Sequence, residues 1–219
     1  MSENKNIQPI LITGAKRSGS TFIARILSMC GAFGGACNNM YENTVIHSLH
    51  YEMLQPESII PKTDGIRIPF NWAELIELEL EQEGWDKQTK YFIKNSLLAL
   101  YWPVWDYAFP DAKWIIVRRR TGDVIQSCLK TGYLKTFKNP EILKTLNVDS
   151  EKEAWLWKIK QYEQKFVEMI QAGLNCRVIW PDRMADGNFL QIMEMVDWLG
   201  LKWNTKIPSV IYPLIENKD

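Results

Sequence analysis

A short apolar run that ends in a glycine-rich turn constrains the fold of this chain more than any other feature. The run IQPILIT, residues 7–13, is apolar almost throughout, which is typical of a strand buried on both faces of a parallel sheet. The turn GAKRSGS begins at Gly14, and the segment TFIARILSMC then places apolar side chains on one face of a helix that ends at Gly31. A buried strand, a glycine-rich turn and a helix in direct succession predict an α/β fold.

Further strands and helices alternate along the chain. Short apolar runs at residues 91–94, 113–117 and 177–180 predict three more strands, and a helical pattern follows the last two of them. Strands that alternate with helices favour a mainly parallel sheet that helices cover on both faces. We therefore expect a three-layer α/β sandwich.

Two helices are predicted from capping boxes, in which a polar residue is followed three residues later by Glu. Ser150 with Glu153 predicts a long helix after residue 150. Asn71 with Glu74 predicts a helix that ends at Gly84, although the alternating tract ELIELELEQE leaves a strand open as the alternative.

Two apolar stretches bear on the core. The helix that ends at Gly200 is expected to turn Phe189, Met193 and Val196 inward. The tryptophan-rich stretch at 97–105 is expected to be core, and an apolar pocket for a substrate is the alternative.

The composition describes a folded domain without a general affinity for polyanions. The 219 residues are 46% hydrophobic and carry 26 Lys plus Arg against 26 Asp plus Glu, so the net charge is zero. Proteins that coat nucleic acid or anionic membranes rely on a long-range positive field, and we expect neither kind of partner. We expect one domain over residues 1–219, with an irregular insert at 31–70 and a carboxyl-terminal tail at 201–219.

The amino terminus and the cysteines favour a cytoplasmic protein. The first residues, MSENKNIQ, are polar and lack the apolar core of a signal peptide. The longest apolar run, at 97–105, is about half the ~18 residues of a membrane-spanning helix. The 4 cysteines lack the paired spacing of metal ligands, and we expect reduced thiols.

The turn that starts at Gly14 has the glycine spacing of a phosphate-binding loop. Its glycines let backbone N–H groups and the amino terminus of the next helix point at one anion. In ATP- and GTP-binding loops a lysine follows the second glycine and the next residue holds Mg²⁺, but this chain has Ser20 at the lysine position and its cations upstream. This departure suits an anion that is neutralised without a metal. The candidate binding residues are Lys16, Arg17, Ser18, Gly19, Ser20 and Thr21.

The sequence Arg-Ser-Gly-Ser-Thr after an apolar strand resembles the 5′-phosphosulfate loop of the sulfotransferases that use 3′-phosphoadenosine 5′-phosphosulfate (PAPS). In that family a basic residue precedes Ser-Gly-Thr, and Arg17 matches it. A second motif of the family is a strand ending in Arg, then a turn, an Asp and a Ser; KWIIVRRRTGDVIQS supplies Arg119, Asp123 and Ser127. The resemblance implies a P-loop-like α/β fold, PAPS as the donor and PAP as the product, with the 3′-phosphate held by Arg119 and Ser127.

Two weaker matches and three departures accompany these motifs. YFIKNS stands where the cytosolic branch of the family has a strand ending in Lys-Thr-His or Lys-Ser-His, so Lys94 matches the lysine and Ser96 replaces the histidine. The segment from VIWPDR to LGL at 199–201 resembles the family's late strand and helix, with Trp180 in place of a tyrosine. The Arg-Lys-Gly loop that closes over PAPS in the cytosolic branch has no counterpart before Asp219.

The resemblance also implies roles in the reaction. Sulfuryl transfer builds charge on peripheral oxygens and on the leaving phosphate, which Arg17, Lys94 and the backbone amides of the loop are expected to stabilise. A base must take the proton of the acceptor, and the histidine of the cytosolic branch is absent here. Other branches use a Glu after the phosphate-loop helix, which makes Glu42 the leading candidate over His47 and His50.

We therefore expect a sulfotransferase that moves a sulfuryl group from PAPS to a hydroxyl or amine of a small-molecule or carbohydrate acceptor, without a metal. A Mg-dependent P-loop kinase of small molecules or nucleotides is one alternative, and Ser20 counts against it. A non-catalytic PAP-binding or partner-binding module is the other, and Ser96 and Trp180 favour it. Because parallel strands end at one sheet edge, we expect the anion site where basic residues follow strands. These residues are Lys16, Arg17, Lys94 and Arg118 to Arg120.

Overall fold

The protein is built around one sheet of parallel strands. The structure is a computed structural model that describes residues 7–54, 71–132 and 135–216. Its four strands lie in the order β2-β1-β3-β4, and each is parallel to its neighbours. Their bounds are β1 (Ile10–Gly14), β2 (Phe92–Lys94), β3 (Lys113–Val117) and β4 (Cys176–Ile179).

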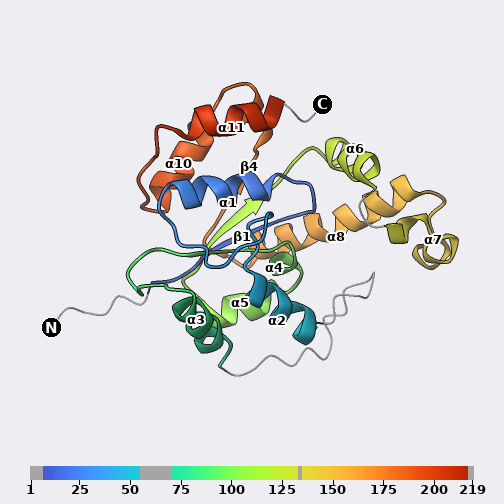
Figure 1. The fold of residues 1–219 in the computed structure, drawn as a ribbon. Coiled ribbons are helices and arrows are strands. Elements are labelled where there is room, and N and C mark those ends of the chain that lie inside the picture. Colours follow the sequence, from blue (N-terminus) through green and yellow to red (C-terminus); the bar gives the residue numbers. More distant parts are fainter. Residues whose placement is uncertain (1–6, 55–70, 133–134, 217–219) are drawn as a thin grey trace.

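Helices fill the connections between the strands and cover both faces of the sheet (Figure 1). In Figure 1, α1, α10 and α11 lie above the sheet, whereas α2, α3, α4 and α5 lie below it. The α/β fold with a parallel sheet between two helical layers is thereby confirmed. The helices are α1 (Ser20–Met29), α2 (Thr44–Leu54), α3 (Trp72–Gln82), α4 (Leu97–Leu100), α5 (Trp102–Ala108), α6 (Thr121–Thr131), the 3-10 helix η1 (Lys135–Lys138), α7 (Pro140–Leu146), α8 (Glu151–Gln171), α9 (Asp182–Ala185), α10 (Leu190–Trp198) and α11 (Ile207–Glu216).

Each face of the sheet has its own hydrophobic core, because successive side chains of a strand point to opposite faces. Leu11 and Ile116 pack with residues of α3, α4, α5 and α8. Ile12, Ile115 and Val117 pack with residues of α1, α10 and α11. A third cluster joins α6 and α7 to the first half of α8. β1 is buried at every residue and β3 at all but Lys113, which explains why their sequences are almost continuously apolar.

Strand bounds differ from the sequence prediction by one residue at β2 and β4 and by more at the first strand. The run at 113–117 is β3 as predicted, but β1 begins at Ile10 and extends to Gly14. Pro9 has no N–H to give to a ladder, and only its carbonyl takes part, accepting a 3.1 Å hydrogen bond from the N–H of Lys113.

The tract after Asn71 is a helix, so the alternative of a strand is wrong. Trp72, Ile76 and Leu80 recur every four residues and are buried on one face of α3. The predicted capping box does not form there, because the Asn71 side chain makes no cap hydrogen bond. At α8 the cap does form, where the N–H of Glu153 donates to the Ser150 hydroxyl (3.3 Å).

Met193 was predicted to point inward, and this is wrong because its side chain is 41% exposed. The buried face of α10 runs instead through Ile192, Met195 and Val196. Ile192 therefore takes the buried position that was predicted for Met193, while Phe189 and Val196 are buried as expected. The stretch at 97–105 packs largely in the first core, as the sequence favoured.

The two irregular segments both contain a helix. The segment at 31–70 includes α2, and its residues 55–70 lie outside the described part of the chain, as do 1–6, 133–134 and 217–219. The predicted tail at 201–219 contains α11, whose Ile207 and Ile211 belong to the second core.

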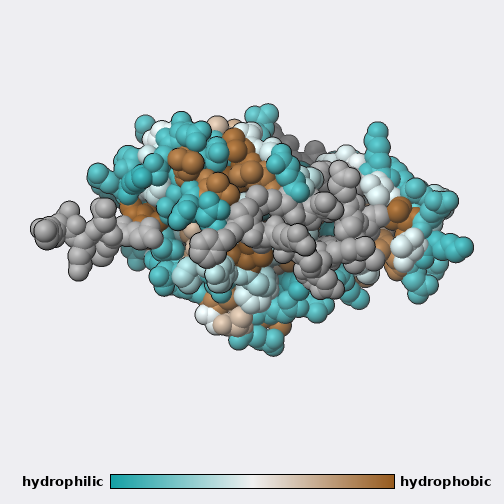
Figure 2. All heavy atoms as spheres, turned by 90° about the horizontal axis from the view of Figure 1, so that it is seen from below, coloured by the Kyte–Doolittle hydropathy of each residue, from teal (hydrophilic) through white to brown (hydrophobic). Residues whose placement is uncertain are grey.

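The surface mixes hydrophilic and hydrophobic side chains. Seen from below, hydrophilic residues cover much of the molecule and hydrophobic ones gather in separate patches between them (Figure 2). Over the described ranges, no helix is both long and apolar enough to cross a membrane.

Candidate active site

The loop between β1 and α1 has the backbone geometry of a phosphate-binding turn. Arg17 and Gly19 have positive φ angles of 67° and 95°, which curl the chain toward the helix. Gly14 has no room for a side chain, because a Cβ there would lie 2.5 Å from both Ser18 Oγ and the carbonyl oxygen of Val117. α1 begins without a side-chain cap and without an acidic residue in its first turn. Its amino terminus therefore turns backbone N–H groups and a positive dipole toward the loop.

Three further residues of this loop are placed by the same turn. Ser18 is 1% exposed, and its hydroxyl has no hydrogen-bond partner within the described residues. Ser20 is the first residue of α1, and the Thr21 hydroxyl donates to the carbonyl oxygen of Met40 at 3.5 Å. Buried polar groups in folded proteins are nearly always hydrogen-bonded, so the Ser18 hydroxyl is a candidate donor to a ligand oxygen.

The loops after β1 and β3 are joined across the centre of the sheet. Arg17 Nε donates a 2.9 Å hydrogen bond to the hydroxyl of Ser127 on α6. β1 and β3 are neighbours, and the chain leaves β1 toward α1 on one face and leaves β3 toward α8 on the other. Sheets of this kind bind ligands at the carboxyl ends of such a strand pair. The structure therefore brings together the two motifs in which the sequence places the nucleotide.

Arg119 follows β3 and is held by a carboxylate. Its Nε donates to Oδ1 of Asp182 at 3.2 Å. The other oxygen of Asp182, Oδ2, is buried without a partner in the described part of the chain. Asp182 begins α9 directly after Pro181, whose ring carbon Cγ would lie 3.1 Å from a Cβ at Gly19. The loop after β4 thus packs on the phosphate loop and carries the partner of Arg119.

The arginines on either side of Arg119 have different surroundings. Arg118 forms an ion pair with Glu163 of α8, and its guanidinium carbon lies 4.9 Å from the ring centre of Trp180. Arg120 is 79% exposed at the side chain and lies 3.6 Å from Asp123. Arg118 is therefore fixed by α8 and Trp180, whereas Arg120 belongs to the solvated surface.

A buried cluster of charges lies beside the phosphate loop. Glu42 Oε1 accepts a 3.0 Å hydrogen bond from Nζ of Lys94, which ends β2, and lies 4.0 Å from Nζ of Lys16. Its second oxygen, Oε2, lies 3.8 Å from Nδ1 of His47. Glu42 and Lys94 are both buried. The structure thus brings Glu42 to the two lysines that the sequence assigned to the site.

The charges of this cluster shift its pKa values. Burial alone would raise the pKa of Glu42, but Lys94 and Lys16 reverse the effect, so the pKa lies below its ordinary value. Burial lowers the pKa of Lys94, which the nearby Glu42 carboxylate opposes. Glu42 is therefore ionised at neutral pH, and a carboxylate beside the loop can accept a proton.

The two histidines occupy different environments. His47 Nδ1 lies 3.1 Å from Nδ2 of Asn95, and burial lowers its pKa. His50 is enclosed in the core, where its Nε2 accepts a 3.0 Å hydrogen bond from Nε1 of Trp105. Burial lowers the pKa of His50 to about 3. Glu42 and His47 thus lie together at the site, whereas His50 is a core residue.

Two groups near the cluster were not singled out as site residues. Asn95, which follows Lys94 and contacts His47, stands at the Thr or Ser position of the Lys-Thr-His match, and no role was predicted for it from the sequence. Lys158 lies on α8 between Trp155 and Tyr162, and burial, helped by the charge of Lys16, lowers its pKa to about 8. A lysine inside an apolar helical stripe is the sequence signal that would have pointed to it.

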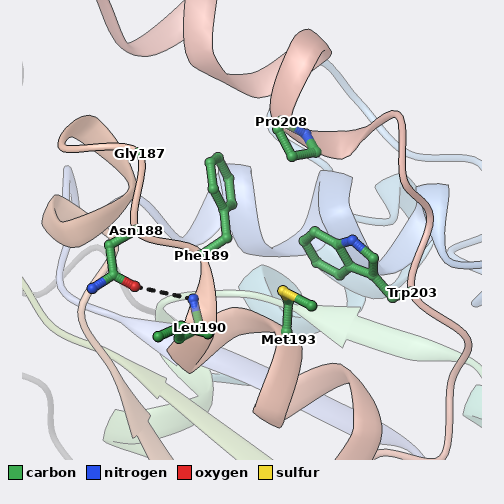
Figure 3. A pocket seen from close by; sticks show the side chains of 7 residues that line it. All are labelled: Gly187, Asn188, Phe189, Leu190, Met193, Trp203 and Pro208. Atoms are coloured by element: carbon green, nitrogen blue, oxygen red, sulfur yellow. Dashed lines mark hydrogen bonds between the residues drawn. The ribbon is translucent and has the colours of Figure 1, made fainter.

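A hollow of about 440 Å³ lies elsewhere on the molecule. It is lined by apolar side chains from the start of α10 and from the segment that leads into α11. Figure 3 shows Phe189, Met193 and Trp203 around it and Pro208 at the start of α11. None of the predicted site residues lines this hollow.

Solved structures resemble this chain, although no protein-family model and no curated protein matches it. Sulfotransferase STF9 from Mycobacterium avium is 10% identical at a TM-score of 0.58, over 97% of this chain and 69% of that one. The sulfotransferase domain of the Synechococcus PCC 7002 olefin synthase is 15% identical at a TM-score of 0.59, over 93% and 77%. Sulfotransferase STF1 from Mycobacterium tuberculosis H37Rv is 14% identical at a TM-score of 0.50, over 92% and 70%. This chain therefore has the sulfotransferase fold.

Proposed function

We propose that this protein transfers a sulfuryl group from PAPS to a hydroxyl or amine of a small-molecule or carbohydrate acceptor. The observation that carries the proposal is the 2.9 Å hydrogen bond from Arg17 to Ser127, because it unites the two loops that the donor would need. One loop suits a sulfuryl-phosphate group and the other a phosphate monoester. The fold of the similar structures supports the same class of reaction.

The residues at the sheet edge fit a doubly phosphorylated nucleotide. The amino terminus of α1, the buried Ser18 hydroxyl and Arg17 would hold the 5′-phosphosulfate. Arg119 and Ser127 would hold the 3′-phosphate. Asp182 contacts Arg119 through Nε, and the two Nη groups of a guanidinium can bind an anion while Nε is engaged.

Glu42 and Lys94 supply what the transfer requires. The acceptor oxygen or nitrogen forms a bond to sulfur as the bond from sulfur to the phosphate oxygen breaks. The bonding electrons leave with PAP, and the acceptor's proton passes to the Glu42 carboxylate. Arg17 and Lys94 offset the negative charge that builds on the transferring and leaving groups. Because sulfuryl transfer is an in-line displacement of this kind, positioned cations suffice and no metal is needed.

Calorimetric titration with PAP, and separately with ATP plus Mg²⁺, tests the nucleotide. We expect metal-independent PAP binding that Arg119→Ala weakens about 10- to 100-fold, the worth of a charge-assisted hydrogen-bond pair. Arg120→Ala is the matched control, because this arginine is exposed and paired with Asp123, and it should bind PAP like the parent. ATP binding that requires Mg²⁺, without a response to PAP, would show a kinase-like site and overturn the proposal.

Release of PAP from PAPS tests the reaction itself. The acceptors are methyl glucoside, cyclohexanol, 2-naphthol and an alkyl amine, each with the protein and without it. Protein-dependent release of PAP, matched by sulfated product, is the expected result. PAP binding without release across this panel would identify a binding module instead.

A further inference from the structure

The hydrogen-bond pattern around His47 dictates which of its ring nitrogens carries the proton. Asn95 lies between Lys94 and α4, and its Oδ1 accepts a 2.9 Å hydrogen bond from the backbone N–H of Leu97. The end of the amide that faces His47 is therefore the NH₂ group, with Nδ2 at 3.1 Å from Nδ1. Because an amide NH₂ can only donate, Nδ1 of His47 must accept, and the proton of the neutral ring sits on Nε2.

The same reasoning places the proton of His50 on the opposite nitrogen. Trp105 Nε1–H is a donor only, and it points at Nε2 of His50 at 3.0 Å. His50 must therefore carry its proton on Nδ1. The chain has 2 histidines, so the structure assigns them opposite tautomers.

The tautomer of His47 decides what it can do beside Glu42. Its Nδ1 is 3.8 Å from Glu42 Oε2, but no proton lies on Nδ1 to donate to that oxygen. A proton taken up at Nδ1 would oppose the NH₂ of Asn95, and Nε2 already holds one. His47 is thus unsuited to be the base, and Glu42 keeps Oε2 for the acceptor's proton. The side chain of His47 is 30% exposed, so the ring that carries the Nε2–H donor is reached by solvent.

We propose that Asn95 holds His47 as a neutral Nε2–H donor. This donor binds an oxygen of the acceptor and so positions the acceptor next to Glu42. This inference rests on the proposed sulfuryl transfer. The acceptor it favours carries an oxygen next to its reacting hydroxyl, as a carbohydrate diol does. One hydroxyl then faces Glu42 and the neighbouring oxygen accepts from His47. A lone alcohol would use Glu42 only.

The charged groups around His47 agree with a neutral ring. Glu42 favours the protonated form, whereas Lys16 and Lys94 oppose it, and burial also opposes it. His50 is on the same helix, and Tyr51 packs on the His47 ring with a centroid distance of 4.7 Å. The pKa of His47 therefore lies below its ordinary value of 6.5.

Nitrogen-15 NMR of the histidine-labelled protein tests the tautomers without any ligand. We expect one histidine with an unprotonated Nδ1 and a protonated Nε2, and the other with the reverse. His47→Gln and His50→Gln assign the two signals by removing one each. A protonated Nδ1 on His47 would overturn the inference. Because the chain has 2 histidines, either variant alone assigns both signals, so the test survives if one of the two variants fails to fold.

Asn95→Asp replaces the hydrogen-bond donor that faces Nδ1 of His47 with an acceptor. The carboxylate still accepts from the Leu97 N–H and can now accept from Nδ1, so the proton should move to Nδ1 and the His47 pKa should rise. An unchanged tautomer and pKa in the folded variant would mean that Asn95 does not set them.

Acceptor kinetics test the role of His47. We expect His47→Phe to raise KM for methyl glucoside about 3- to 10-fold, the worth of one hydrogen bond, with a smaller change in kcat and none in KM for cyclohexanol. His47→Gln, which keeps a donor, should restore part of the loss. Loss of kcat in His47→Gln with both acceptors would make His47 the base and refute the donor role. If no acceptor releases PAP while the NMR result holds, the proposed function fails and the tautomer assignment stands.

Discussion

At the scale of single residues, the Glu42 carboxylate is the group on which the proposed chemistry depends. Its two lysine neighbours hold its pKa below the ordinary value, so it is charged at neutral pH. The same lysines carry the positive charge that a departing phosphate would need. One buried ion pair thus supplies both a proton acceptor and a stabilising cation.

Glu42→Gln should abolish most of the turnover without weakening the binding of PAP. Loss of a general base typically costs about 100- to 10,000-fold in rate, whereas PAP should bind as tightly as before or more tightly, because a negative charge has been removed. PAP release and calorimetry measure the two effects. Glu52→Gln, an exposed change on α2, is the control. Undiminished turnover in Glu42→Gln would remove Glu42 from the mechanism.

The pKa of Glu42 also predicts the acid limb of the pH profile. A base is active when it is deprotonated, and the pKa of Glu42 is below 4.5 in the folded protein. The rate should therefore stay level as the pH drops through the neutral range and decline only below pH 4.5. A rate that already falls well above pH 4.5 would contradict Glu42 as the base.

At the scale of elements, the sequences of β1, of the loop after it and of α1 each suit the structure that they form. β1 is apolar because both of its faces are buried. Gly14 lies against Val117 of β3 with no room for a side chain, and Gly19 has a positive φ angle of 95°. These demands are local, which is why the sequence predicts this unit well. The register of α10 was less predictable, because apolar residues such as Met193 lie on both of its faces.

Gly14→Ala should destabilise the protein. The added Cβ would lie 2.5 Å from the Val117 carbonyl oxygen, which belongs to the sheet and cannot move away cheaply. Overpacking of this kind costs about 1–3 kcal/mol. Gly122→Ala is the control, because a Cβ there meets nothing within 4 Å and alanine favours the helix α6. Urea unfolding measures both variants, and equal midpoints for the two would contradict this account of Gly14.

At the scale of the whole molecule, stability should depend on the protonation of His50. The pKa of His50 is about 3 in the folded protein against 6.5 ordinarily. Between these values the unfolded chain binds a proton that the folded protein excludes, so the free energy of unfolding falls as the pH is lowered. The loss should reach about 2 kcal/mol by pH 5 and grow toward pH 3.

His50→Gln isolates this effect. The Gln side chain does not titrate, and its carbonyl oxygen can accept from Trp105 in place of Nε2. Urea unfolding between pH 7 and 5 should therefore show a shallower slope in the variant than in the parent. The same slope in both would mean that other groups cause the acid loss of stability.

The sequence by itself determined which segments along the chain are strands or helices, that the sheet is parallel, and the loop after β1. Hydrophobic periodicity and glycine spacing are local properties, so they can be read from the sequence. It also placed the basic residues at strand ends. Only the tertiary structure decided their partners: Glu42 with Lys94 across 52 residues, Arg17 with Ser127 across 110, and Arg119 with Asp182 across 63. The physical reason is the strand order β2-β1-β3-β4, which puts the carboxyl ends of strands distant in sequence side by side. No local sequence pattern encodes this spatial order of the strands, so none predicted which carboxylate would pair with which cation.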